Sequence, residues 1–208
     1  MTSFPGIPRP AMMAACFCCL RCCWHGTGFS TGHVPLKDLP EVKLDTNHLG
    51  NDVVIVKNGR RICGTGGALA SAPIVQNKAF FEVKLQSSGV WGLGLATRKA
   101  DLHSVPLGMN SESWVLKDDG ILMHNNEEKG KLADLPQEGD IIGVTFDHIE
   151  LNFYLNGKPL GTPFTGIKGT VFPVVYVDEG AILDVQFCTF YHPPPEGFER
   201  IMIEQSLL

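Results

Sequence analysis

Five of the seven cysteines stand within eight residues near the N-terminus, and this thiol cluster is the strongest chemical feature of the chain. Apolar Phe, Leu and Trp side chains lie among and beside them. We prefer reversible S-acylation as the interpretation, because stable membrane anchoring takes at least two acyl chains and neighbouring cysteines could carry them. The predicted lipidation sites are Cys16, Cys18, Cys19, Cys22 and Cys23.

Two other interpretations of the cluster stay open, an unmodified flexible tail and zinc or redox chemistry. Cys19 and Cys22 have the spacing of a zinc knuckle. A tetrahedral zinc site, however, normally closes a loop between two separated ligand pairs. The seven histidines form no His-x-His or His-Glu-x-x-His pair that could supply further ligands. We therefore predict neither a metal site nor a cofactor.

The charge balance and the length of the apolar runs exclude some kinds of partner. The chain has 17 Lys and Arg against 22 Asp and Glu, with no basic stripe, so nucleic acid is not an expected partner. The apolar run at residues 11–20 is too short for a membrane-spanning helix, which needs about 20 residues. With no Asn-x-Ser/Thr sequon and only two cysteines outside the cluster, we expect a cytoplasmic protein that reaches a membrane only through acylated cysteines.

Turn dipeptides divide most of the remaining chain into short strands. Asn58-Gly59, Asp119-Gly120 and Asn156-Gly157 each stand between two apolar runs. Such dipeptides favour the type I′ turns of β-hairpins, because both residues tolerate positive φ. Residues 151–155 alternate with a period of two, which is typical of a half-buried strand. The sequence therefore predicts three hairpins.

The fold class is predicted to be all-β. Further apolar runs at residues 80–86, 90–96, 171–177 and 182–187 follow at short spacing, without an amphipathic helical pattern between them. Because one sheet cannot bury so many apolar faces, we expect a bent antiparallel two-sheet β-sandwich. The composition separates a flexible Pro-, Cys- and Gly-rich segment, residues 1–35, from a single domain at residues 36–208.

Several side chains can be assigned to the core or the surface. Trp91 and Trp114 lie within strand patterns and are expected in the core. Cys63 and Cys188 are expected to be buried, reduced thiols. Asp184 alternates with apolar neighbours, so we expect it on the solvated face of its strand.

The order of several motifs resembles the SPRY domain, the core of the B30.2 family, across most of residues 44–198. The motifs are Lys78-Ala-Phe-Phe-Glu-Val, Trp91-Gly-Leu-Gly-Leu-Ala, Gly139-Asp140-Ile-Ile-Gly-Val and Phe172-Pro173-Val-Val. This resemblance implies a concanavalin-like bent β-sandwich that recognises a protein or short peptide through its loops. It also implies an adaptor without catalytic activity.

The resemblance extends to the loops that bind peptide in SPRY proteins carrying a SOCS box, which correspond to residues 98–108 and 178–180 here. The aromatic anchors of that peptide pocket are replaced by Leu107 and by Asp178-Glu179. A shared surface is therefore implied, but not a shared ligand. The candidate partner-binding residues are Arg98, Leu102, His103, Ser104, Val105, Leu107, Asp178 and Glu179.

Two other function classes are alternatives to a protein-binding module. A hydrolase on this sandwich would need a nucleophile and a base, for example Ser104 with His103 or His124, but no nucleophile-elbow or metal motif accompanies them. A lectin-like reader of glycans or small molecules is the other alternative. We expect a module that is not an enzyme and binds an unidentified protein or peptide.

Overall fold

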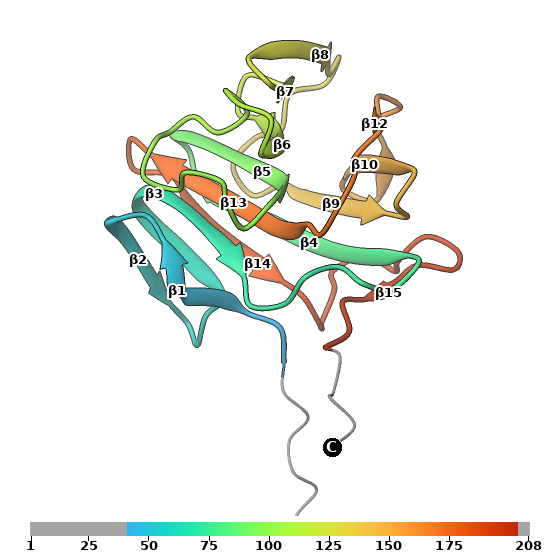
Figure 1. Ribbon diagram of the computed structural model, residues 1–208, viewed down its shortest axis with the longest axis horizontal. Coiled ribbons are helices and arrows are strands. Elements are labelled where there is room, and N and C mark those ends of the chain that lie inside the picture. The colour runs from blue at the N-terminus through green and yellow to red at the C-terminus, as the bar shows by residue number, and fades with distance from the viewer. Residues whose placement is uncertain (1–40, 204–208) are drawn as a thin grey trace, which may run out of the picture. The chain divides into compact units, whose positions relative to one another are not determined.

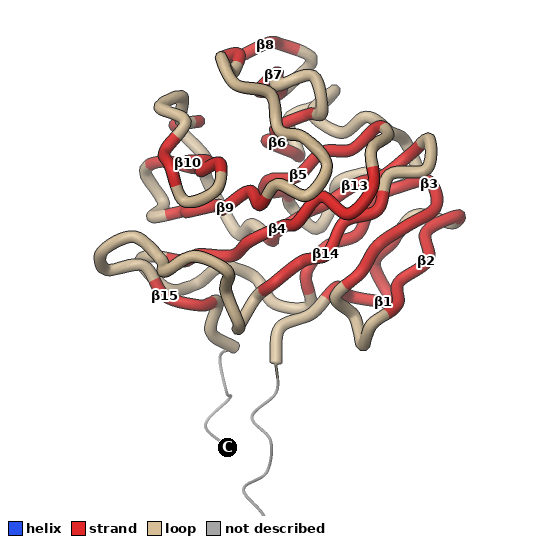
Figure 2. Tube along the Cα trace, turned by 180° about the vertical axis from the view of Figure 1, so that it is seen from behind, coloured by secondary structure: helices blue, strands red, loops and turns tan. Residues whose placement is uncertain are grey.

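The computed structural model describes residues 41–203, and every regular element in that range is a β-strand (Figures 1 and 2). The predicted all-β class is therefore confirmed. In chain order the strands are β1 (Leu44–Leu49), β2 (Asp52–Val56), β3 (Arg61–Ala70), β4 (Ala79–Ser87), β5 (Val90–Ala96), β6 (Ser113–Lys117), β7 (Ile121–His124), β8 (Glu127–Lys131), β9 (Ile141–Phe146), β10 (Glu150–Leu155), β11 (Lys158–Pro159), β12 (Phe164–Thr165), β13 (Phe172–Asp178), β14 (Ile182–Gln186) and β15 (Glu199–Arg200).

The strands form two sheets that share the long strand β3 (Figure 1). The first half of β3 pairs with β2 and β14, and β14 continues through β4 and β9 to β10 in what we call the β4 sheet. The second half of β3 pairs with β1 and β13, and β13 continues through β5, β6 and β7 to β8 in the β13 sheet. All pairs are antiparallel except β15 with β4.

The change of sheet along β3 occurs at a pair of glycines. Gly64 and Gly66 have φ values of 96° and 128°, a region that residues with a Cβ rarely adopt. This local geometry lets one strand leave the β4 sheet and enter the β13 sheet. The result is the curled, bent sandwich that the sequence predicts.

Apolar side chains of both sheets fill the main core between them. Phe81 and Val83 from β4 and Leu93 and Leu95 from β5 are almost completely buried there. Trp91 is also in this core, with 4% of its surface exposed. Trp114 was predicted to be a core residue as well and is 8% exposed. Both tryptophan predictions are confirmed.

A second group of buried side chains, the outer cluster, covers the opposite face of the β13 sheet. Strand β13 contributes Val175 and Val177 to the main core, and Phe172, Val174 and Tyr176 to the outer cluster. Burial on both faces explains why β13 is an almost continuous apolar run rather than an alternating one. The outer cluster comprises Leu69, Ala96, Leu102, Leu107, Val115, Phe172, Val174 and Tyr176.

All three predicted hairpins form, but only one has the predicted two-residue turn. Leu155 pairs with Lys158, so Asn156 and Gly157 are the whole turn, and both have positive φ. The turn between β2 and β3 has four residues, since Val56 pairs with Arg61. Between β6 and β7 the N–H of Gly120 donates to the carbonyl of Lys117 at 3.0 Å, again in a longer turn.

Asp184 was predicted to lie on the solvated face of its strand. This prediction is wrong, because only 5% of its surface is exposed. Strand β14 lies between β4 and β3, and Asp184 is in register with Arg61 on β3. Arg61 donates to both carboxylate oxygens, and Lys57 Nζ lies 3.1 Å from Oδ2.

Cys63 and Cys188 are half-buried free thiols rather than fully buried ones. The five clustered cysteines and the expected boundary at residue 36 lie outside the described residues.

Candidate functional site

The long connection between β5 and β6 holds most of the predicted partner-binding residues and is fixed by two buried leucines. Leu102 is 7% exposed and Leu107 is 5% exposed, and both belong to the outer cluster. The carbonyl of Leu102 also accepts the N–H of Gly67 on β3 at 2.8 Å. Val105 is half-buried and packs against the same cluster. These apolar side chains therefore anchor the connection to the β13 sheet.

The exposed tip of this connection is organised by Asp101. One carboxylate oxygen accepts the backbone N–H of His103 at 3.1 Å, and the other accepts the hydroxyl of Ser104 at 2.7 Å. The hydrogen bond from Ser104 is the main reason that the pKa of Asp101 is lowered. The Nδ1 atom of His103 accepts the backbone N–H of Asn51, which follows β1, at 3.2 Å. The tip is therefore held in one position while His103 and Ser104 stay exposed.

The second predicted loop, residues 178–180, joins β13 to β14. Asp178 Oδ1 accepts the hydroxyl of Thr65 at 2.9 Å and the N–H of Glu179 at 2.8 Å. Thr65 is in register with Asp52 on β2, the residue after Asn51. A continuous series of contacts therefore joins the two predicted loops along one edge of the domain.

We call this edge the loop surface. It is formed by polar residues from four separate segments: Asn51, Asp52, Thr65, Asp101, His103, Ser104, Asp178 and Glu179. Sequence reasoning missed Asn51, Asp52 and Thr65, because only the pairing of β2 with β3 brings them between the loops. None of its four carboxylates is in an ion pair among residues 41–203, so the loop surface offers negative charge and hydrogen-bond acceptors.

Arg98 was predicted to belong to this site, and the structure places it far from the 178–180 loop. Its guanidinium carbon lies 4.6 Å from the ring centroid of Phe172, the first residue of β13. Asp178 is the last residue of the same strand, and six residue steps in a strand span roughly 20 Å. Arg98 is therefore at the other end of β13 from the 178–180 loop.

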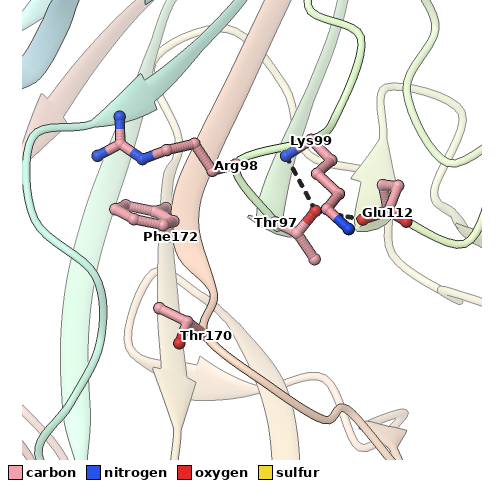
Figure 3. Close-up of a pocket in the computed structure, with 6 residues that line it drawn as sticks. All are labelled: Thr97, Arg98, Lys99, Glu112, Thr170 and Phe172. Carbon is pink, nitrogen blue, oxygen red and sulfur yellow. Dashed lines mark hydrogen bonds between the residues drawn. The ribbon is translucent and has the colours of Figure 1, made fainter.

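A pocket of about 390 Å³ opens beside Arg98 (Figure 3). Arg98 Nη1 lies 2.8 Å from His48 Nε2, while His48 Nδ1 lies 2.8 Å from Asp45 Oδ2. The pKa of Asp45 is lowered. Burial alone would raise this pKa, but the N–H of Asn47 and the ring of His48 outweigh burial. The pocket is lined by Thr97, Arg98, Lys99, Glu112, Thr170 and Phe172.

The candidate nucleophile and bases make other contacts. Ser104 donates to Asp101, and His103 Nδ1 faces the Asn51 N–H. His124 stacks on Trp114 with ring centroids 4.6 Å apart, and its Nδ1 lies 2.9 Å from the carbonyl of Ser113. Neither histidine is hydrogen-bonded to the Ser104 hydroxyl.

Residues 41–203 contain no group of three or more His, Cys, Asp or Glu side chains arranged to hold a metal ion. The same residues contain no helix that could cross a membrane.

Known proteins share both the sequence pattern and the fold. The SPRY domain pattern matches residues 78–190. Over 198 residues the chain is 62% identical to SPRY domain-containing protein 7 of Bos taurus and 61% identical to that of Homo sapiens, and each alignment covers 94% of this chain and 100% of the relative. The solved TRIM65 PSpry domain matches with a TM-score of 0.59 at 17% identity, covering 70% of this chain and 92% of that chain. The chain therefore belongs to the SPRY domain family, as its motifs predict.

Proposed function

We propose that this SPRY protein is an adaptor without catalytic activity, which binds a protein or short peptide through the loop surface. SPRY domains form a family of protein-interaction modules. The observation that carries the proposal is the joining of four separate segments into one exposed edge. Leu102 and Leu107 anchor its backbone from below, while His103, Ser104 and Glu179 are exposed. A surface that is already ordered loses less entropy on binding.

The negative charge of the loop surface favours a partner segment that carries positive charge or hydrogen-bond donors. Asp52, Asp101, Asp178 and Glu179 supply negative charge and hydrogen-bond acceptors. Complementary charge on the partner speeds association and selects against the wrong partner. We therefore propose a segment that presents Lys or Arg side chains, or amide N–H groups, to these carboxylates.

The contacts of Ser104 support an interaction role rather than hydrolysis. A serine nucleophile needs a base within hydrogen-bond reach, itself oriented by a third group. Here the Ser104 hydroxyl donates to Asp101, which holds the loop tip. The contacts among Asp101, His103 and Ser104 therefore hold an exposed loop tip in place.

Affinity capture from cells tests the interaction. A double variant, Ser104→Arg with Glu179→Arg, places positive charge on the loop surface at two exposed positions. We expect it to lose partners that the wild-type protein retains, and we expect those partners to dissociate at high salt. Lys158→Glu on β11 is the matched control, because Lys158 is also exposed and lies in the β4 sheet. Equal loss in the control, or retention in the double variant, would refute the proposal.

Membrane tethering by the N-terminal cysteines is a separate part of the proposal. Its support is compositional: five thiols in eight residues could carry more than one acyl chain. Acyl-biotin exchange should label the wild-type protein. In membrane fractionation, the variant with Cys→Ser at positions 16, 18, 19, 22 and 23 should move to the aqueous fraction. An unlabelled wild-type protein with an unchanged distribution would remove tethering and leave the loop surface as the proposed site.

A further inference from the structure

Strand β2 forms one edge of the β4 sheet, and no other strand covers its outer side. It pairs with β3 along residues 52–56, and β3 is the only strand that pairs with it among residues 41–203. Figures 1 and 2 both show β2 at the margin of the described domain. Residues 53–56 read Val-Val-Ile-Val, without the lysine, proline or bulge that usually protects an edge strand. Such a strand is a template for pairing with another chain.

The N–H and carbonyl groups of Ile55 point away from β3, towards the free side. The N–H of Val53 donates to the carbonyl of Gly50 at 3.2 Å and not to β3. Along an antiparallel ladder, pairs that exchange backbone hydrogen bonds alternate with pairs that do not. Val53 and Ile55 therefore both belong to pairs that do not. Because the N–H of Val53 is already used, Ile55 is the residue that can both donate and accept at this edge.

The pairing on the other side of β3 agrees with this direction. Ile62 lies opposite Ile55 and is also in register with Leu183 on β14. Two residues further along β14, the N–H of Val185 donates to the carbonyl of Arg60 at 2.7 Å. By the same alternation, Ile62 exchanges its backbone hydrogen bonds with Leu183. The backbone groups of Ile55 are therefore without a partner on β3.

The side chains of β2 divide between two faces. Val53 is 8% exposed, and Ile55 packs against the main core. Val54 and Val56 lie on the opposite face and are 52% and 42% exposed. An incoming strand would find both backbone hydrogen bonds and an apolar contact with these valines.

The two ends of β2 differ in charge. Asp52 at its start belongs to the loop surface, whose carboxylates form no ion pair among residues 41–203. At its end, around the turn at residues 57–60, cations outnumber carboxylates. The cations are Lys43, Lys57, Arg60 and Arg61, and the carboxylates are Glu41 and Asp184. Antiparallel pairing of two copies places the negative end of each strand beside the positive end of the other, which favours association.

We propose that β2 pairs with β2 of a second copy of this chain, antiparallel and about a two-fold axis through Ile55. The two Ile55 residues then exchange two N–H···O=C hydrogen bonds, and Val54 of each copy lies opposite Val56 of the other. Both copies use the same surface, as a two-fold interface requires. One strand pair buries less than the roughly 1,200 Å² of a stable interface, so the dimer dissociates on dilution. The inference does not depend on the function proposed for the loop surface.

Sedimentation velocity of the reduced, full-length protein tests the dimer. We expect the mean mass to rise from monomer towards dimer between about 10 µM and 1 mM. Val54→Lys should weaken association at least about tenfold, because a charged lysine at an edge opposes strand pairing. Val75→Lys is the matched control, since Val75 is 49% exposed and lies outside β2; association should be unchanged there. High salt should also weaken the dimer.

Disulfide trapping tests the register. Cys63 and the five clustered cysteines are first replaced by Ser, because Cys63 lies opposite Val54 on β3. A mixture of Val54→Cys and Val56→Cys proteins should then form a disulfide-linked dimer, since residues directly opposite each other are close enough for a disulfide. Neither protein alone should do so, because diagonal neighbours lie about 7–8 Å apart. Thermal unfolding of each variant confirms that it is folded.

Four results would overturn the proposal: a monomer at every concentration, equal association of the wild type and Val54→Lys, equal weakening in Val75→Lys, or a disulfide-linked dimer from Val54→Cys alone. A protein that stays monomeric would leave an extended segment of another protein as the occupant of β2. A dimer trapped only in the mixture, and lost in Val54→Lys, is the result that the proposal predicts.

Discussion

Asp184 illustrates how a buried charge is tolerated at the residue scale. Burial raises its pKa, but hydrogen bonds from Arg61 and Lys57 outweigh burial and lower the pKa below the ordinary value for an aspartate. The ion pair also connects β14 to the start of β3 and to the β2–β3 turn. It therefore supports the β4 sheet at the start of β3.

Asp184→Asn should lower the free energy of unfolding by about 1–3 kcal/mol, because Arg61 is left without its charged partner. The folded-state pKa of Asp184 is depressed, so its contribution is present above the unfolded pKa, near 4, and is lost as pH falls through the folded value. Urea unfolding at pH 7 and pH 3 measures both effects. Equal losses at the two pH values would contradict this account.

Tyr176 presents the opposite case, a buried hydroxyl without a partner among the described residues. Burial raises the pKa of Tyr176, since the charged form could not be solvated. Its ring lies so close to Gly92 that a Cβ there would overlap it. Tyr176→Phe keeps the ring and removes the unsatisfied group, so stability should be unchanged or rise by up to about 1 kcal/mol. A loss above about 1 kcal/mol in urea unfolding would indicate a hydrogen bond that this account lacks.

Some residue assignments follow from sequence and others do not. Trp91 and Trp114 lie in strands, where alternation predicts a buried face, and both predictions are confirmed. Leu102 and Leu107 lie in a long connection without periodicity. Their burial depends on a contact with the outer face of the β13 sheet, which neighbouring residues in sequence do not specify.

At the scale of elements, β3 depends on glycine where it changes sheets. A Cβ at Gly64 would overlap the carbonyl oxygen of Asp52, and the φ of 96° is itself unfavourable for alanine. Gly64→Ala should therefore cost more than about 2 kcal/mol. Gly180→Ala is the matched control, because φ there is 83° but nothing lies within 4 Å of the added Cβ; its cost should be about 1 kcal/mol. Thermal unfolding that ranks the two in the reverse order would contradict this role for β3.

The β5–β6 connection depends on its buried leucines. Leu102→Ala should cost about 2–3 kcal/mol, as expected for a buried leucine. Amide hydrogen exchange at residues 98–108 should accelerate in the same variant, because the connection loses its anchor. His103→Ala, at the exposed neighbour, should change stability by less than about 0.5 kcal/mol. Unchanged exchange in Leu102→Ala would show that the backbone bond to Gly67 is sufficient.

Most strands could be predicted because their signals are local. Turn dipeptides and two-residue alternation identify β9 and β10 and the turn after them. The four-residue turn at residues 57–60 and the three-residue turn at residues 118–120 differ from the predicted type, since strand pairing, and not the dipeptide alone, sets turn length. The pairing of the two halves of β3 with different sheets is a long-range property, which no local motif specifies.

At the scale of the whole molecule, the loop surface and the Arg98 pocket lie towards opposite ends of β13. The loop surface lies where β13 ends at Asp178, and the Arg98 pocket lies where β13 begins at Phe172. Both His103 and Arg98 were assigned to one site because the resemblance to SPRY proteins carrying a SOCS box places residues 98–108 in one loop.

The most direct test of partner binding at the loop surface is site-specific photo-crosslinking in cells. A photoreactive residue is placed at His103 in one full-length protein and at Lys158 in another. Binding through the loop surface predicts a discrete adduct from position 103 that disappears in the Glu179→Arg background and has no counterpart from position 158. The same adduct at equal yield from position 158, or an adduct from position 103 that persists with Glu179→Arg, would contradict it.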